Sequence, residues 1–152
     1  MKTVNTKLSS GERLPLLIGD SGIPDMWIAT YIMVKCRTNH DFNTMRNVVC
    51  RLRSFRYFEQ IYNRNAEAEF SKGQFLTESD CEKLRAFSWI NQSSLNIENG
   101  IDEHSNLFAG VRYVSAEVCA QRLRDIRKFL IFMAETVNRS AVHEKRIRNS
   151  IN

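Results

Sequence analysis

Arginine is concentrated in one short stretch of this chain. Residues 43–65 hold one acid, Glu59, among five arginines, which are Arg46, Arg51, Arg53, Arg56 and Arg64. A guanidinium keeps its charge at every physiological pH, and its planar donors match carboxylate and phosphate oxygens. An ordinary solvated helix face mixes both signs of charge. The stretch therefore indicates either a solubilising surface or a binding surface for an anion.

Residues for catalysis or metal binding are not grouped in the sequence. His40, His104 and His143 are far apart and stand among polar residues, which is typical of exposed histidine. The sequence lacks the glycine-rich phosphate loops, the nucleophile elbow of hydrolases and the histidine pair of zinc proteases. We therefore expect no enzymatic activity, no catalytic residues, no metal site and no cofactor.

The cysteines and the absence of long apolar runs suggest a cytoplasmic protein. The four cysteines are scattered without a CxxC pair, which is typical of reduced thiols in the cytosol. We expect Cys50 to be the most reactive, because it lies off the apolar stripe of its helix, and Cys119 to be protected. No apolar run approaches the ~20 residues of a membrane span, so we expect no membrane partner.

Composition and charge narrow the class of partner. The 152 residues are 43% hydrophobic and 26% charged, which suits one globular domain with a core of its own. The net charge of +5 favours an acidic partner, with nucleic acid the commonest and an acidic protein surface the next.

A helix over residues 41–62 must position most of the arginines. Its apolar residues recur at steps of three and four, namely Met45, Val48, Val49, Leu52, Phe55, Phe58 and Tyr62. Asp41 is placed to cap its first turn. Arg46 and Arg53 fall opposite the apolar stripe, and Arg51 and Arg56 fall on its flanks.

Three further helices and a hairpin complete the predicted fold. One helix follows Pro24, one begins after Thr77 with Asp80 in its first turn, and a long one runs from about Ser115 to residue 137. On the last, Arg124 and Lys128 lie opposite the apolar stripe. Residues 3–19 read as two extended pieces around an SSGE turn, and residues 92–110 as a long loop.

We therefore predict a mainly α fold, a bundle of about four helices with a small N-terminal hairpin. The expected divisions are an extended segment over 1–22, a helical domain over 23–138, and a basic linker over 139–152. Two basic helix faces could match the phosphates of duplex DNA. At this point nucleic-acid binding and docking of an acidic protein by a helical interaction module both stay open.

Three segments, in this order, resemble the N-terminal core-binding half of site-specific tyrosine recombinases, the phage-integrase family. In the first, NTMRNVVCRLRSF, the matching residues are Asn43, Thr44, Leu52, Arg53 and Phe55. The second is GQFLT, residues 73–77, in which Gln74 replaces the usual glutamate. In the third, VSAEVCAQRLRDIRKFLIFMA, the matching residues are Val114, Ser115, Ala116, Arg122, Leu123, Ile126, Phe129 and Leu130. Val118 stands where the family usually has a threonine, which is a departure from the family's pattern at one expected phosphate contact.

The resemblance, which spans residues 20–135, implies a SAM-like helical domain that grips double-stranded DNA at a recombination site. In the family, a separate C-terminal domain with a tyrosine nucleophile cleaves and joins the strands. No tyrosine follows the third segment, so we expect this chain to bind DNA without cleaving it. The implied setting is a bacterial cytoplasm, with self-association in the full-length recombinase assembly. The expected DNA contacts are Asn43, Thr44, Arg46, Arg53, Arg122, Arg124 and Lys128, with Arg51, Arg56 and Arg127 as further candidates.

Overall fold

A computed structural model describes residues 1–74, 76–95, 108 and 110–151 of the chain, with side chains as far as Arg139. Two strands, β1 (Lys2–Lys7) and β2 (Arg13–Ile18), precede the helices α1 (Met26–Tyr31), α2 (Phe42–Ile61), α3 (Ala66–Ser71), α4 (Glu78–Ser88) and α5 (Ala116–Ile151). Two short helical pieces, the π-helix η1 (Ile32–Cys36) and the 3-10 helix η2 (Gln92–Ser94), are also present. The predicted mainly helical fold with an N-terminal hairpin is confirmed.

The hairpin packs directly on the helices. β1 and β2 are antiparallel, with Lys2 opposite Ile18 and Lys7 opposite Arg13. The turn between them depends on Gly11, whose φ of 85° is unfavourable for a residue with a Cβ. Leu14 and Leu17 are 4% and 1% exposed and belong to the same core as the helices. Residues 1–22 therefore share one core with the segment that follows them.

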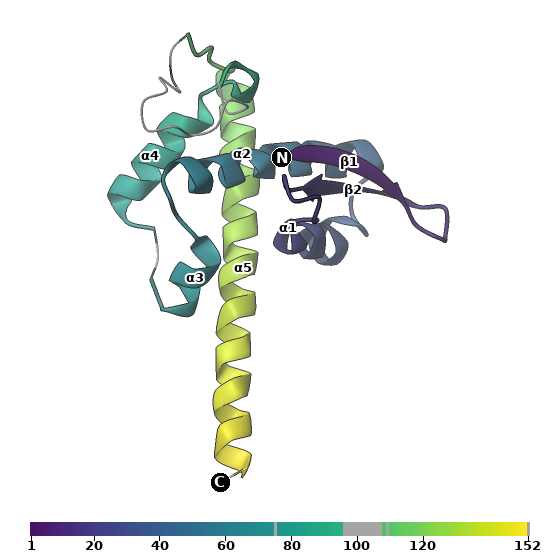
Figure 1. The fold of residues 1–152 in the computed structure, drawn as a ribbon, viewed down its shortest axis with the longest axis vertical. Helices are drawn as coiled ribbons and strands as arrows, with labels where there is room; N and C mark the ends of the chain where they lie inside the picture. Colours follow the sequence, from purple (N-terminus) through teal and green to yellow (C-terminus); the bar gives the residue numbers. More distant parts are fainter. Residues whose placement is uncertain (75, 96–107, 109, 152) are drawn as a thin grey trace.

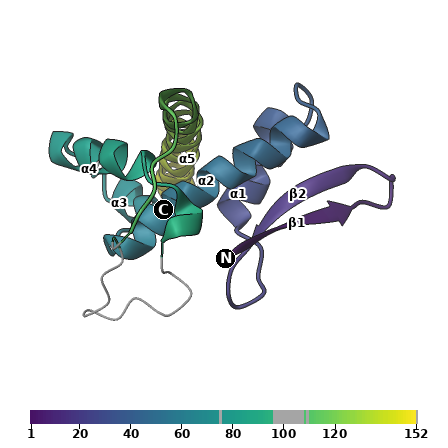
Figure 2. The ribbon, with the colours of Figure 1, turned by 90° about the horizontal axis from the view of Figure 1, so that it is seen from above.

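Helix α2 is the central element of the fold. It begins where the sequence predicts, since the Asp41 carboxylate accepts a hydrogen bond from the backbone N–H of Thr44 at 2.7 Å. It crosses α5, and α1 and the hairpin lie on one side of α5 while α3 and α4 lie on the other (Figures 1 and 2). Val49, Leu52 and Phe55 are at most 1% exposed. The exposed residues of α2 lie mostly in its first turns, at Asn43, Thr44, Arg46 and Asn47.

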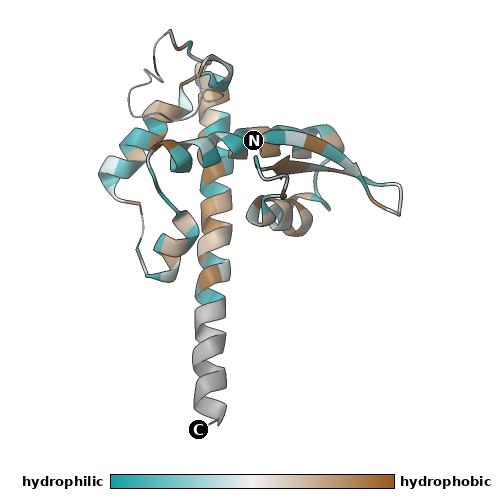
Figure 3. Cartoon of the chain, viewed as in Figure 1, coloured by the Kyte–Doolittle hydropathy of each residue, from teal (hydrophilic) through white to brown (hydrophobic). Residues whose placement is uncertain are grey.

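Helix α5 is the long axis of the molecule. Ser115 precedes it, and the Ser115 hydroxyl accepts a hydrogen bond from the N–H of Val118 at 3.4 Å. Its apolar residues lie in the part of the helix that runs beside the other helices (Figure 3). Among them, Ile126, Phe129 and Met133 are almost fully buried. The helix continues to Ile151, so residues 139–151, expected as a linker, prolong it and project beyond α3 (Figure 1).

The region after α4 is described in part. The loop expected over residues 92–110 begins with η2. Residues 111–115 then lead into α5, and the N–H of Val114 donates to the carbonyl of Trp89 at 2.8 Å. Residues 96–107 and 109, which include His104, lie outside the described residues. Within the described part, no helix combines the length and the apolar character needed to cross a bilayer.

Candidate nucleic-acid interface

Two arginines of α2 are occupied by ion pairs that join it to its neighbours. Nη1 of Arg51 lies 2.8 Å from Oδ2 of Asp125 on α5. Nε of Arg56 lies 2.6 Å from Oδ2 of Asp25, the residue that caps α1, and its Nη1 lies 2.5 Å from Oε2 of Glu59. Glu59 and Asp125 are each only 7% exposed. Arg51 and Arg56 thus serve the fold, because removing either would leave a poorly solvated carboxylate.

Arg64, just after α2, is occupied in the same way. Its Nη2 lies 2.6 Å from Oε2 of Glu69 on α3, and its Nη1 contacts Asp80 on α4. Asp80 also forms the capping box of α4 with Thr77. The Arg64 guanidinium, helped by Thr77, holds the pKa of the Asp80 carboxyl well below its usual range. Three of the five arginines in residues 43–65 are therefore neutralised by carboxylates.

Arg46 and Arg53 lie on the hairpin side of α2. Cys50 and Tyr57 mark that side: Cys50 Sγ is 3.8 Å from Thr3 Oγ1, and the Tyr57 hydroxyl donates to the Met1 carbonyl at 3.4 Å. Residues three and four apart share a helix face, so Arg46 and Arg53 point the same way. Arg46 is exposed, whereas Arg53 is half-buried, and its Nε has no hydrogen-bond partner among the described residues.

Asn43 and Thr44 are both exposed in the first turn of α2. Thr44 lies one turn before Val48, on the side of α2 that faces α5, because Val48 and Lys128 line one pocket. Arg46 and Arg53 are about 160° around the helix from that side, taking about 100° per residue. Thr44 therefore shares the α2 face of Val48, and Arg46 and Arg53 lie on a different side of the helix.

Arg122 has a structural role, unlike the DNA contact that the sequence predicts. It is 7% exposed, and its Nη1 donates to the carbonyls of Ser88 at 2.7 Å and Ile90 at 2.9 Å. Burial lowers the pKa of its guanidinium. Arg122 thus satisfies carbonyls at the end of α4 and ties α4 to α5. It does not reach the surface on which it was expected.

The outer face of α5 keeps a group of free cations. Arg124, Arg127 and Lys128 are exposed, and Arg127 and Lys128 follow Arg124 by three and four residues, so each is a neighbour of Arg124 on the helix surface. None of the ion pairs among the described residues involves them, and Arg124 only donates to the side chain of Gln121. The acid within this segment, Asp125, is buried and paired with Arg51. We call these three residues the α5 basic face.

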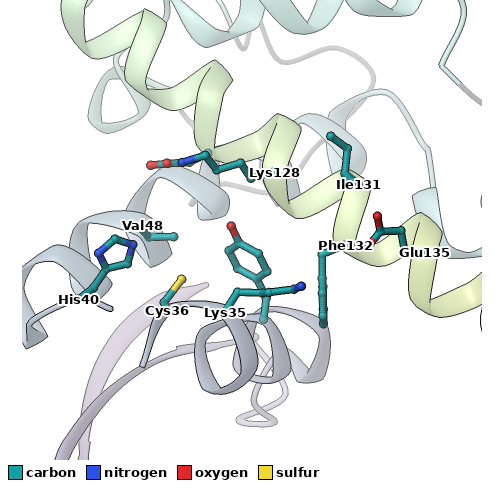
Figure 4. Close-up of a pocket in the computed structure, with 10 residues that line it drawn as sticks. Lys35, Cys36, His40, Val48, Lys128, Ile131, Phe132 and Glu135 are labelled. Carbon is teal, nitrogen blue, oxygen red and sulfur yellow. The ribbon is translucent and has the colours of Figure 1, made fainter. Parts of the chain in front are cut away.

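A pocket of about 360 Å³ opens beside Lys128. Lys35, Cys36 and His40 reach it from η1 and the residues after it, Val48 from α2, and Lys128 and Phe132 from α5 (Figure 4). Burial raises the pKa of the Cys36 thiol and raises the pKa of Tyr31, another lining residue, to about 12. Sequence patterns miss this grouping, because His40 reads as an ordinary exposed histidine and the other lining residues come from separate elements.

Comparison with protein-family models, with curated proteins and with solved structures gave no match to this chain.

Proposed function

We propose that this chain binds nucleic acid, with duplex DNA as the ligand, through the α5 basic face. The observation that carries the proposal is the contrast between the two helices. The arginines of α2 are paired or turned toward the hairpin, whereas Arg124, Arg127 and Lys128 are exposed and unpaired among the described residues. A row of free cations along a helix matches the phosphate array of DNA, and the major groove admits an α-helix.

The sequence beyond Arg139 extends the same charge. Residues 140–151 contain Lys145, Arg146 and Arg148 against one acid, Glu144, and they continue α5 past the other elements (Figure 1). A projecting basic helix leaves room for a duplex alongside it. This supports α5, rather than α2, as the helix that meets DNA.

The resemblance to recombinases supports a role in gripping DNA rather than cutting it. Its three segments fall on α2, on the approach to α4 and on the first half of α5. We therefore propose a core-binding module of a site-specific recombinase, with strand cleavage assigned to another part of the assembly.

A protein partner is the second candidate, and one observation favours it. Met26, Met33 and Val34 on α1 and η1 are 66%, 40% and 58% exposed, and Ile23 just before them is 65% exposed. Exposed large apolar side chains mark a docking site for protein where they form one surface. Binding there would depend weakly on salt, which separates it from binding to phosphates.

The test is a salt series of anisotropy titrations with a fluorescent duplex. Each neutralised phosphate contributes about −0.9 to the slope of log K against log salt, so three contacts contribute about −2.7. Replacing Arg124, Arg127 and Lys128 together by Ala should make the slope shallower by about that amount. Arg85→Ala, which removes an exposed arginine from α4, is the matched control and should leave it unchanged. Equal slopes for the triple variant and the wild type would end the proposal.

A further inference from the structure

The pocket beside Lys128 has the make-up of an anion site. Lys35, His40 and Lys128 bring cationic or protonatable groups to it from two sides, while Val48, Ile131 and Phe132 supply apolar surface (Figure 4). Its volume of about 360 Å³ falls within the range of small-molecule sites, roughly 300–1,000 Å³. A phosphate would fill only part of it, so a small organic group could accompany the anion.

The charge balance of the pocket is positive. The carboxylate of Asp125 lies at the wall but is satisfied by Arg51 at 2.8 Å. Glu135 is then the one unpaired acid among the described lining residues, against two lysines. The Lys35 ammonium lies 5.9 Å from the centre of the Phe132 ring and forms no ion pair with any described residue. Both lysines are therefore available to an incoming anion.

The backbone that presents Lys35 is unusual. Residues Ile32–Cys36 form a π-helix, in which the N–H of Arg37 donates to the carbonyl of Ile32, five residues back, at 2.9 Å. Single π turns inside helices are rare and occur often at functional sites. Here the wide turn buries Cys36 and leaves Lys35 at the pocket. The next residue, Arg37, is held by Glu12 of the hairpin turn and does not compete for the same anion.

The remaining polar groups of the pocket can donate to an anion without repelling it. Tyr31 is 5% exposed, and its raised pKa of about 12 keeps the phenol protonated at neutral pH. The Cys36 thiol also stays protonated, because burial and the Asp125 charge raise its pKa. An anion would thus meet two ammonium groups, an imidazole and neutral donors.

We propose that this pocket binds a phosphate group, carried either by a free phosphomonoester or by a backbone phosphate of a nucleic acid. Lys35 and Lys128, on opposite walls, can neutralise a doubly charged phosphate. The apolar surface at Phe132 can contact the organic part of an ester. The proposal goes beyond the α5 basic face, since Lys35 and His40 lie outside that face. A free phosphomonoester would bind even if the chain bound no DNA.

The experiment titrates the chain with phenyl phosphate by calorimetry and, in parallel, with a fluorescent duplex. The variants are Lys35→Met and His40→Gln, with Lys83→Met, an exposed lysine of α4, as the matched control. Lys35→Met should weaken the phosphate-bearing ligand roughly tenfold or more, as expected for loss of one charged contact. His40→Gln should weaken it less, and Lys83→Met should have no effect. Circular dichroism of each variant confirms that it is folded.

The two arms separate the sources of phosphate. Saturable binding of phenyl phosphate that Lys35→Met weakens identifies a free ester as the ligand. Duplex affinity that falls with Lys35→Met, without saturable binding of phenyl phosphate, identifies a backbone phosphate. If folded Lys35→Met binds both probes as the wild type does, or if neither probe binds, the proposal is wrong. Arg124→Ala should leave binding of phenyl phosphate unchanged, so a failure of the α5 basic face is recognised separately.

Discussion

Arg51 on α2 and Asp125 on α5 form an ion pair of 2.8 Å where the two longest helices cross. The Asp125 side chain is 9% exposed and that of Arg51 is 27% exposed. Asp125 also lines the Lys128 pocket. The pair therefore connects the packing of α2 on α5 to the wall of that pocket.

Breaking this pair should destabilise the fold. Arg51→Ala leaves the Asp125 carboxylate poorly solvated and without its partner, so we expect a loss of about 2 kcal/mol in the free energy of unfolding. This is less than the about 3–5 kcal/mol for a fully buried pair, since Arg51 keeps part of its surface in water. Urea denaturation at pH 7 measures it, with Arg85→Ala as a surface control that should change by under about 0.5 kcal/mol. A loss as small as that of the control would contradict the role assigned to the pair.

A substitution of Arg122 can distinguish a structural role from a DNA contact. Arg122→Met keeps the apolar stem but leaves the carbonyls of Ser88 and Ile90 without the guanidinium that now satisfies them. We expect the free energy of unfolding to fall by about 1–3 kcal/mol, because buried carbonyl acceptors would lose their hydrogen-bond donor. The salt dependence of duplex binding, measured well below the melting temperature, should not change. A shallower slope of log K against log salt with an unchanged melting temperature would instead show that Arg122 contacts DNA.

Stability should depend on acidic pH through Asp80. Its folded pKa is depressed by Arg64 and Thr77, so its contribution is complete above the unfolded pKa of about 3.9 and is lost as the pH falls toward the folded value. Asp80→Asn should therefore be less stable than the wild type at pH 7. The difference should shrink progressively below pH about 4. Urea midpoints between pH 7 and pH 2.5 measure this, and a difference that stays constant over the range would show that Asp80 has no depressed pKa.

The cysteines should react in an order that the sequence does not give. Cys81 is exposed on α4, Cys50 is half-buried beside Thr3, and Cys36 and Cys119 are buried. Burial also raises the pKa of Cys36 and Cys119, which reduces their thiolate fraction. We expect labelling by iodoacetamide to begin at Cys81 rather than Cys50 and to reach Cys36 and Cys119 last. Mass spectrometry of timed samples gives the order, and early labelling of Cys119 would contradict the burial of this face of α5.

Local patterns in the sequence are enough to predict most of the elements. Asp41 begins α2, Thr77 and Asp80 form the capping box of α4, and the SSGE turn separates β1 from β2, because each depends on residues a few positions apart. The short helix α3 is missed, since six residues give too little periodicity. The π-helix is missed because its apolar run looks like ordinary helix.

The faces of the helices are harder to predict, because what covers them comes from distant residues. The spacing in α2 correctly places Arg53 away from the apolar stripe, but it describes only the position of Arg53 on its own helix. The hairpin of residues 2–18 then packs against that side, which spacing within α2 cannot reveal. Likewise Arg122 looks like a surface residue until α4 brings the Ser88 carbonyl to it. Arg124 and Lys128 stay exposed, although Lys128 also lines the pocket that α5 shares with η1 and α2.

The arginines on the hairpin side of α2 should differ from Lys128 of α5 in their effect on DNA binding. If DNA meets the α5 basic face, Arg46 and Arg53 are on the wrong side to contact it. Arg53→Ala and Arg46→Ala should each leave the salt slope of duplex binding unchanged, whereas Lys128→Ala should make it shallower by about 0.9. Arg53→Ala should also lower the melting temperature slightly, because its half-buried stem packs beside the hairpin, while Arg46→Ala should not. Anisotropy titrations and thermal melts of the three variants measure both effects. A slope that changes with Arg46 and Arg53 but not with Lys128 would move the interface to the hairpin side of α2.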